Sequence, residues 1–259
     1  MYPILFSIGP LHIYGYGFMI ALGVFIALFV ASKRAPKLNL NPDVILNITL
    51  LAVVFGLLGA KILFCIVEFP AFIADPMGTI FSGNGFVVYG GLISGILTGV
   101  IYCKRKGHNF LKYFDIVMPS IAIAQGFGRI GCFLAGCCYG QETDLPIGVV
   151  FHASEIAPNG VKLIPTQLIS SVGDFLIAFI LIALSKKIKT DGNVGILYLA
   201  LYCVGRFGIE FYRADFRGSV GPFSTSQLIS VFVAVIALVA FILNQKRHKK
   251  MTEATKSEE

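Results

Sequence analysis

The stretch that decides the fold class is residues 44–67, VILNITLLAVVFGLLGAKILFCIV, in which Lys61 is the only charged residue. About 20 consecutive apolar residues are enough to cross the hydrocarbon core of a bilayer as an α-helix. Hydrophobic residues make up 56% of the 259-residue chain and charged residues only 14%, which excludes a soluble domain with an ordinary polar surface. Residues 44–67 therefore predict one span of an integral membrane protein.

Six further apolar runs of similar length predict an all-α, polytopic membrane protein with seven transmembrane helices. The seven runs cover residues 14–32, 44–67, 86–103, 115–137, 165–184, 194–212 and 224–243. We expect a single transmembrane domain over residues 1–243 and a basic, disordered cytoplasmic tail over 244–259. Two longer connections, at about 68–85 and 138–164, predict a small extracytoplasmic cap.

The basic residues predict the orientation of these spans. Fifteen of the 21 lysines and arginines lie in the first, third and fifth connections and in the C-terminal tail. Because basic residues accumulate on the cytoplasmic side of membrane proteins, this pattern predicts an N-terminus outside and a C-terminus in the cytoplasm. The net charge of +7 is therefore mainly a topology signal, and no nucleic-acid partner is expected.

Charged residues inside the apolar runs indicate a functional site. Arg206, Glu210 and Arg213 are four and three residues apart, so they share one helix face, and Arg129 lies in another run. Charges at bilayer depth rarely face lipid, and guanidinium groups match the geometry of a phosphate. The alternative is a structural ion-pair network that holds helices together.

Glycine and cysteine residues leave more than one interpretation open. Gly90 and Gly91 follow Tyr89 and would allow close approach either of a lipid head group or of a neighbouring helix. The cysteines at 132, 137 and 138 are compatible with packing, with a disulfide or with a chemical role. Their spacing matches no metal-binding pattern. The sequence predicts no metal and no organic cofactor.

Seven short segments together resemble the prolipoprotein diacylglyceryl transferase family, and they extend over almost the whole chain. They are residues 9–19 (GPLHIYGYGFM), 56–61 (GLLGAK), 89–95 (YGGLISG), 128–133 (GRIGCF), 165–168 (PTQL), 206–213 (RFGIEFYR) and 224–228 (STSQL). The resemblance implies a transferase of the bacterial cell membrane that acts in lipoprotein biosynthesis. It would move a diacylglyceryl group from phosphatidylglycerol to the lipobox cysteine thiol of a preprolipoprotein signal peptide, and release glycerol phosphate. The expected partners are these two substrates and the lipid bilayer.

The resemblance also implies roles for individual residues. Arg129 and Arg206 match the two essential arginines of the family and would bind the phosphate. Glu210 would orient Arg206. The remaining substrate-binding residues implied by the resemblance are Arg213, Tyr16, Gly90, Gly91, Gly140 and Lys61.

Several positions depart from the family pattern. Tyr89 stands where the family usually has the histidine that is its favoured general base, and it is retained as a catalytic candidate. Tyrosine titrates near pH 10, so at pH 7 it is better suited to donate a hydrogen bond than to accept a proton. Cys132 and Cys137 replace Asn and Glu, and Lys61 replaces Arg. Two alternatives to the family reaction follow: a divergent lipid-group transferase with the same fold, or a transporter for an anionic solute.

Overall fold

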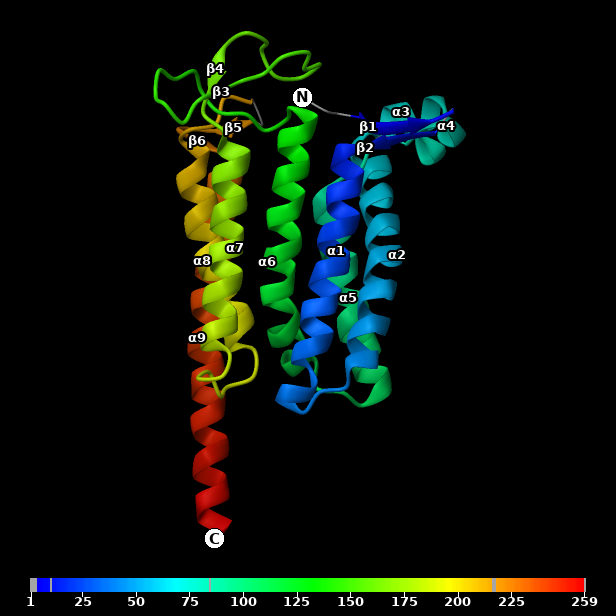
Figure 1. The fold of residues 1–259 in the computed structure, drawn as a ribbon. Helices are drawn as coiled ribbons and strands as arrows, with labels where there is room; N and C mark the ends of the chain where they lie inside the picture. Colours follow the sequence, from blue (N-terminus) through cyan, green and yellow to red (C-terminus); the bar gives the residue numbers. More distant parts are fainter. Residues whose placement is uncertain (1–3, 10, 84, 216–217, 259) are drawn as a thin grey trace. The chain divides into compact units, whose positions relative to one another are not determined.

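The computed structural model describes residues 4–9, 11–83, 85–215 and 218–258, and helices dominate it (Figure 1). The chain divides into two compact units, which we describe separately. One contains Met1–Val30 and Phe114–Glu259, and the other contains Ala31–Tyr113. Helices α1 (Gly15–Arg34) and α6 (Phe110–Ala135) contribute residues to both units.

Five of the described helices are long and apolar enough to cross a membrane. They are α1, α2 (Pro42–Val67), α6, α7 (Thr166–Leu184) and α9 (Thr225–Glu258). This confirms the prediction of an all-α, multi-pass membrane protein. Two predicted spans form helices of 19 and 18 residues, α5 (Val88–Lys106) and α8 (Asn193–Glu210), that are less apolar. The reason is that α5 ends in three consecutive basic residues, and α8 carries Arg206 and Glu210.

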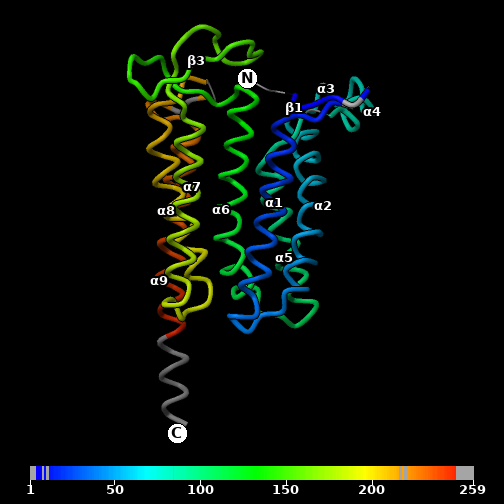
Figure 2. Tube along the Cα trace, viewed as in Figure 1, coloured from blue at the N-terminus to red at the C-terminus, as the bar shows by residue number. Residues whose placement is uncertain are grey.

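The unit of residues 31–113 is built on the close packing of α2 against α5, both of which can be followed in Figure 2. A Cβ atom at Gly90 would collide with the backbone of Gly59 and with Leu63. Gly56 and Gly91 also lie opposite each other, with 3.2 Å between the Gly56 carbonyl oxygen and an ideal Gly91 Cβ position. Small residues thus bring the two helices together, as is common in membranes. The 3-10 helix η1 (Pro36–Leu38) precedes α2, and the short helices α3 (Phe69–Ala74) and α4 (Pro76–Phe81) follow it.

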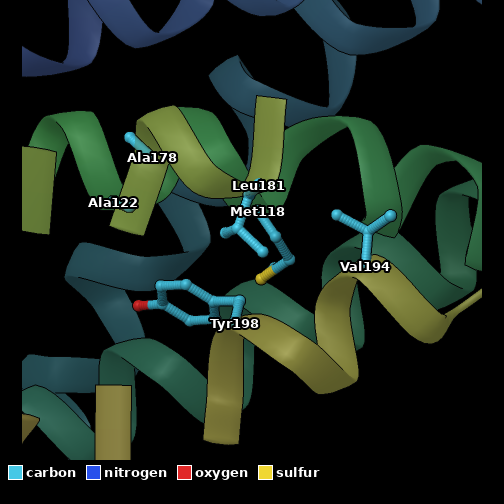
Figure 3. Close-up of a cluster of buried hydrophobic side chains, with 6 residues drawn as sticks. All are labelled: Met118, Ala122, Ala178, Leu181, Val194 and Tyr198. Atoms are coloured by element: carbon cyan, nitrogen blue, oxygen red, sulfur yellow. The ribbon is translucent and has the colours of Figure 1, made fainter. Parts of the chain in front are cut away.

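In the other unit, α6, α7 and α8 enclose a buried apolar cluster (Figure 3). Met118 and Ala122 come from α6, Ala178 and Leu181 from α7, and Val194 and Tyr198 from α8. Helix α9 packs along α8, and α1 meets α6 where Gly23 lies against Phe127. A hairpin of β1 (Ile4–Ile8) and β2 (Leu11–Tyr14) precedes α1.

The connection between α6 and α7 has a small core of its own. Strands β3 (Val149–Val150) and β4 (Lys162–Leu163) pair in it, and Phe151, Ala157 and Leu163 are buried together. Strands β5 (Ser219–Val220) and β6 (Phe223–Ser224) pair before α9. Helix α9 extends to Glu258 and includes most of the predicted tail. The extracytoplasmic location of the cap, the disorder of the tail and the orientation of the chain stay predictions.

Candidate functional site

The C-terminal end of α8 carries the charged face expected from the sequence. Because Arg206 and Glu210 are one helical turn apart, their side chains meet, with 2.5 Å between Arg206 Nη1 and Glu210 Oε2. Both side chains are buried, with 11% and 7% of their surface exposed. The Nη2 of Arg206 also donates a hydrogen bond of 2.7 Å to Ser226 Oγ in the first turn of α9. Glu210 and Ser226 thus hold the Arg206 guanidinium in one orientation.

Arg213 lies just beyond the end of α8 and is paired differently. Its Nε and Nη2 donate hydrogen bonds of 3.0 and 2.7 Å to the two carboxylate oxygens of Asp215. Its Nε is also 3.8 Å from Glu210 Oε2. Burial lowers the pKa of the Arg213 guanidinium, but the hydrogen bonds to Asp215 and the nearby Cys138 thiol outweigh burial and raise that pKa. Arg213 is therefore a firmly held cation whose charge Asp215 neutralises.

Arg129 and Arg206 come from different helices and line the same cavity. The cavity has a volume of about 530 Å³ and lies between residues of α6, α7, α8 and the connection that follows α6. Its lining is mainly apolar and includes Leu145, Ile147, Ile164, Ile169, Ile177 and Ile209. Leu145 and Ile147 are 54% and 55% exposed, so the cavity reaches the surface of the unit. Among the described residues, none forms a hydrogen bond or ion pair with the Arg129 guanidinium.

The same cavity contains a carboxylate that the sequence analysis did not select. Asp174, on α7, is 5% exposed and lines the cavity with both arginines. Its Oδ2 is buried and has no hydrogen-bond partner among the described residues. A signal was available, because Asp174 is the only charged residue in the predicted span 165–184. An intramembrane carboxylate is by default a candidate functional group.

Gly140 and Tyr16 lie close to these elements. The backbone of Gly140 forms a bridge with Arg213 and donates a hydrogen bond of 3.0 Å to the Ile164 carbonyl oxygen. A side chain at residue 140 would collide with Ile164 and Thr166, so only glycine fits. Tyr16, on α1, is 45% exposed and packs its ring beside Gly131 of α6.

The other predicted site residues belong to the unit of residues 31–113. Tyr89 is the second residue of α5, and about half of its surface is exposed. Gly90 and Gly91 make the close contact between α5 and α2 described above, which supports a packing role. Lys61 donates hydrogen bonds of 3.0 and 2.9 Å to the carbonyl and hydroxyl oxygens of Ser82, and its ammonium lies 4.9 Å from the centre of the Phe86 ring. Lys61, on α2, thus holds the segment after α4 in contact with α2.

Three cysteines lie close together in space: Cys132 in the last turn of α6, and the adjacent residues Cys137 and Cys138 just beyond that helix. The sulfur atoms of Cys132, Cys137 and Cys138 all lie within 4.8 Å of one another, and no disulfide joins cysteines in the described residues. Hydrogen bonds with the Cys132 and Cys138 thiols, together with burial, raise the pKa of Cys137. The disulfide considered from the sequence is therefore not formed here, and the packing and chemical interpretations remain.

Comparison with known proteins identifies the family. The family model of prolipoprotein diacylglyceryl transferase matches residues 3–243. Phosphatidylglycerol–prolipoprotein diacylglyceryl transferase from Clostridium tetani (strain Massachusetts / E88) is 48% identical over 250 residues, covering 96% of this chain and 100% of that protein. Transferase 2 of the same name from Clostridium perfringens (strain 13 / Type A) is 45% identical, covering 96% and 98%. The enzyme of that name from Clostridioides difficile (strain 630) is 35% identical, covering 94% and 96%. The chain therefore belongs to the prolipoprotein diacylglyceryl transferase family.

Proposed function

We propose that this protein transfers the diacylglyceryl group of phosphatidylglycerol to the lipobox cysteine thiol of preprolipoproteins in the bacterial cell membrane, and releases glycerol phosphate. The names of its relatives supply both substrates, phosphatidylglycerol and a prolipoprotein. The observation that carries the proposal for this chain is the apolar cavity lined by Arg129 and Arg206. It offers cationic groups to a phosphate and apolar walls to the lipid part of the same molecule.

The reaction breaks a carbon–oxygen bond to the phosphate and forms a carbon–sulfur bond to the thiol. Negative charge grows on the departing phosphate as the carbon–oxygen bond breaks. Fixed guanidinium groups in a low-dielectric cavity stabilise that charge without having to reorganise. Arginine suits this role better than lysine, because its planar fork donates two parallel hydrogen bonds to phosphate oxygens. We therefore assign Arg129 and Arg206 to the phosphate in the bound lipid and in the leaving group.

The surrounding charges support a division of labour between the arginines. Glu210 and Ser226 orient Arg206, so this guanidinium is held in place before the lipid arrives. Arg213 is neutralised by Asp215, and we assign it to the organisation of the site rather than to tight phosphate binding. Arg129, with no such partner among the described residues, is the cation best suited to gain a phosphate. The Asp174 carboxylate lines the same cavity, so its negative charge repels a phosphate that binds beside Arg129.

We assign Tyr89 to hydrogen bonding rather than to proton removal. A phenol is neutral at pH 7 and can donate a hydrogen bond to a phosphate oxygen or to a bridging water. Tyr16 and Gly140 complete the proposed binding site, since they lie at the same end of α6 as the cysteines and Arg213. Gly90, Gly91 and Lys61 hold α5 and the segment after α4 on α2, and their roles in substrate binding stay predictions.

We propose seven spans, with α5 and α8 inserted beside the five more apolar helices. Both have the required length, and the charges that make them less apolar lie in the last turn of α5 and in the last two turns of α8. The distribution of lysine and arginine supports an N-terminus outside and a C-terminus in the cytoplasm. In this orientation the connections at about 68–85 and 138–164, and the C-terminal end of α8, face outward.

A transfer assay tests the proposal. The purified protein in detergent is mixed with phosphatidylglycerol and a lipobox peptide, and the mass of the peptide is measured. We expect a mass gain equal to one diacylglyceryl group, lost in Arg129→Ala and in Arg206→Ala, with both variants still folded. No gain, while the C. tetani relative is active in parallel, would favour the alternatives of a divergent lipid transferase or an anion transporter.

A further inference from the structure

The cluster of Cys132, Cys137 and Cys138 is a candidate metal site, and none of the roles proposed above uses it. Cys132 is in the last turn of α6, and Cys137 and Cys138 follow the end of that helix. Their sulfur atoms lie within 4.8 Å of one another. Cys132 and Cys137 are partly exposed, and Cys138 is buried. Three soft ligands are thus presented together, and the cluster is partly exposed.

The backbone holds this arrangement in place. Gly136 and Cys138 have positive φ angles of 73° and 63°, which turn the chain back toward Cys132. The carbonyl oxygens of Cys137 and Cys138 accept hydrogen bonds of 2.7 Å from the side chains of Gln167 and Thr166, both fully buried. A left-handed conformation at a non-glycine residue is unfavourable and is retained only where the surroundings enforce it. The cluster is therefore built into the fold rather than formed by mobile side chains.

We propose that Cys132, Cys137 and Cys138 bind one zinc ion, whose fourth coordination position takes the thiol of the acceptor peptide. Zinc prefers four tetrahedral ligands, and sites with three protein ligands and one open position are typical of catalytic zinc. With zinc–sulfur bonds of about 2.3 Å, tetrahedral geometry places ligand sulfurs about 3.8 Å apart. Small side-chain rotations bring three sulfurs that lie within 4.8 Å of one another to that spacing.

The charges near the cluster suit this complex. Zinc with three thiolates carries one net negative charge, and binding of a fourth thiolate adds another. Arg129 precedes Cys132 by three residues on α6, so the two share a helix face. The guanidinium of Arg213 lies beside the Cys138 thiol. Two cations are thus available to an anionic zinc–thiolate complex, and Arg129 connects it to the phosphate cavity.

The inference rests on the proposed transfer reaction and supplies a step that the chain otherwise lacks. A zinc-bound thiol loses its proton outright, so the acceptor needs no strong base, and Tyr89 can stand where the family usually has a histidine. The proton leaves to solvent as the acceptor sulfur binds zinc. That sulfur then forms a bond to the glyceryl carbon, and the carbon–oxygen bond to phosphate breaks. Its electron pair departs with glycerol phosphate, and no oxidant or reductant is needed.

Metal binding is tested first, without reference to transfer. The full chain is purified in detergent, loaded with zinc and analysed for metal content, and the loading is repeated with cobalt(II). We expect about one zinc ion per chain. We also expect the thiolate-to-cobalt charge-transfer band and the d–d absorption of a tetrahedral site. A lipobox peptide should shift the d–d bands, and the same peptide with serine in place of cysteine should not.

Cysteine variants test whether the metal binds at this cluster. The change of all three cluster cysteines to serine should abolish both the zinc and the cobalt spectrum. The matched control replaces the three cysteines outside the cluster, Cys65, Cys103 and Cys203, and should retain both. If the cluster variant fails to fold, the cobalt titration of the unmodified chain still decides whether three thiolates bind. An unchanged zinc content in the folded cluster variant would overturn the proposal. So would mass spectrometry showing that the purified cluster carries a disulfide and takes up no metal.

The catalytic part is tested separately in the transfer assay. Treatment with 1,10-phenanthroline should reduce transfer about 100-fold or more, the scale of lost acid–base catalysis, and added zinc should restore it. The non-chelating isomer 1,7-phenanthroline is the control. Metal bound at the cluster with transfer unaffected by chelation would overturn the acceptor-thiol role. Metal bound as expected, but no transfer under any condition, would instead count against the proposed function.

Discussion

Replacement of Arg206 by lysine tests the phosphate role with the charge preserved. In the structure Arg206 has two polar partners, an ion pair with Glu210 and a hydrogen bond to Ser226, so at most two of its N–H groups are occupied. A guanidinium has five N–H donors, so three remain for a phosphate. Lysine has three donors on one nitrogen, and the same two partners would leave one. The substitution thus removes up to two charge-assisted hydrogen bonds to the substrate.

The count of donors gives the size of the expected effect. A hydrogen bond to a charged group contributes about 1.5–3 kcal/mol. Loss of two therefore lowers transition-state stabilisation by about 3–6 kcal/mol, and each 1.4 kcal/mol corresponds to about tenfold in rate. We expect kcat/KM for phosphatidylglycerol to fall by about 100-fold to 10,000-fold in Arg206→Lys. Because the positive charge remains, a purely electrostatic role would be affected far less.

The assay is the mass gain of the lipobox peptide at several phosphatidylglycerol concentrations, so that kcat and KM are separated. Arg105→Lys is the matched control, because Arg105 is an exposed residue in the last turn of α5. Thermal unfolding in detergent checks that both variants are folded. If Arg206→Lys retained more than about a third of the activity of the unmodified chain, with the control unaffected, the reasoning from donor geometry would be refuted.

Four further predictions follow from individual contacts. Tyr89→Phe should lower kcat/KM about tenfold or more through loss of one hydrogen bond to the phosphate or to its bridging water; full activity would remove Tyr89 from the mechanism. Glu210→Gln should lower the free energy of unfolding by about 3–5 kcal/mol, measured by thermal unfolding, because two buried arginines lose a shared carboxylate. Gly90→Ala should destabilise the protein by about 1–3 kcal/mol in the same measurement. Gly95→Ala, on the same helix with open space beside it, should not, and equal effects would contradict the packing role. Asp174→Asn should lower the KM for phosphatidylglycerol about three- to tenfold by removing a negative charge from the cavity; a fall in kcat would instead show that Asp174 takes part in the chemistry.

The helices could be predicted from the sequence because membrane insertion depends on local apolar length. Residues 44–67 become α2 (Pro42–Val67), and residues 165–184 become α7 (Thr166–Leu184), within two residues at each end. The start of α2 is fixed by Asn41, whose side chain accepts a hydrogen bond from the backbone N–H of Asp43. The less apolar character of α5 and α8 arises from charges, and those in α8 are the same ones that indicated a site.

Local spacing also predicted the pair of Arg206 and Glu210, since residues four apart on a helix necessarily face the same side. It could not predict contacts that depend on the path of the chain between elements. The approach of Cys137 and Cys138 to Cys132 requires a left-handed turn at Gly136 and at Cys138, and cysteine gives no sequence signal for that conformation. The position of Asp174 in the cavity of Arg129 depends on how α7 packs against α6. Both features were therefore visible only in three dimensions.

The charge balance of the site indicates that a bound phosphate should stabilise Arg129 more than it stabilises Arg206 or Arg213. At the end of α8, Arg206 and Arg213 are offset by Glu210 and Asp215, so that part of the site is close to neutral without lipid. Arg129 and Asp174 line one cavity, yet no ion pair between them occurs in the described residues. A partly buried cation without a contact partner is unfavourable unless a ligand supplies one. Binding of a phosphate beside Arg129 should therefore be strongly favoured, and loss of the phosphate with the leaving group should restore the unpaired state, which helps the cavity to accept the next lipid.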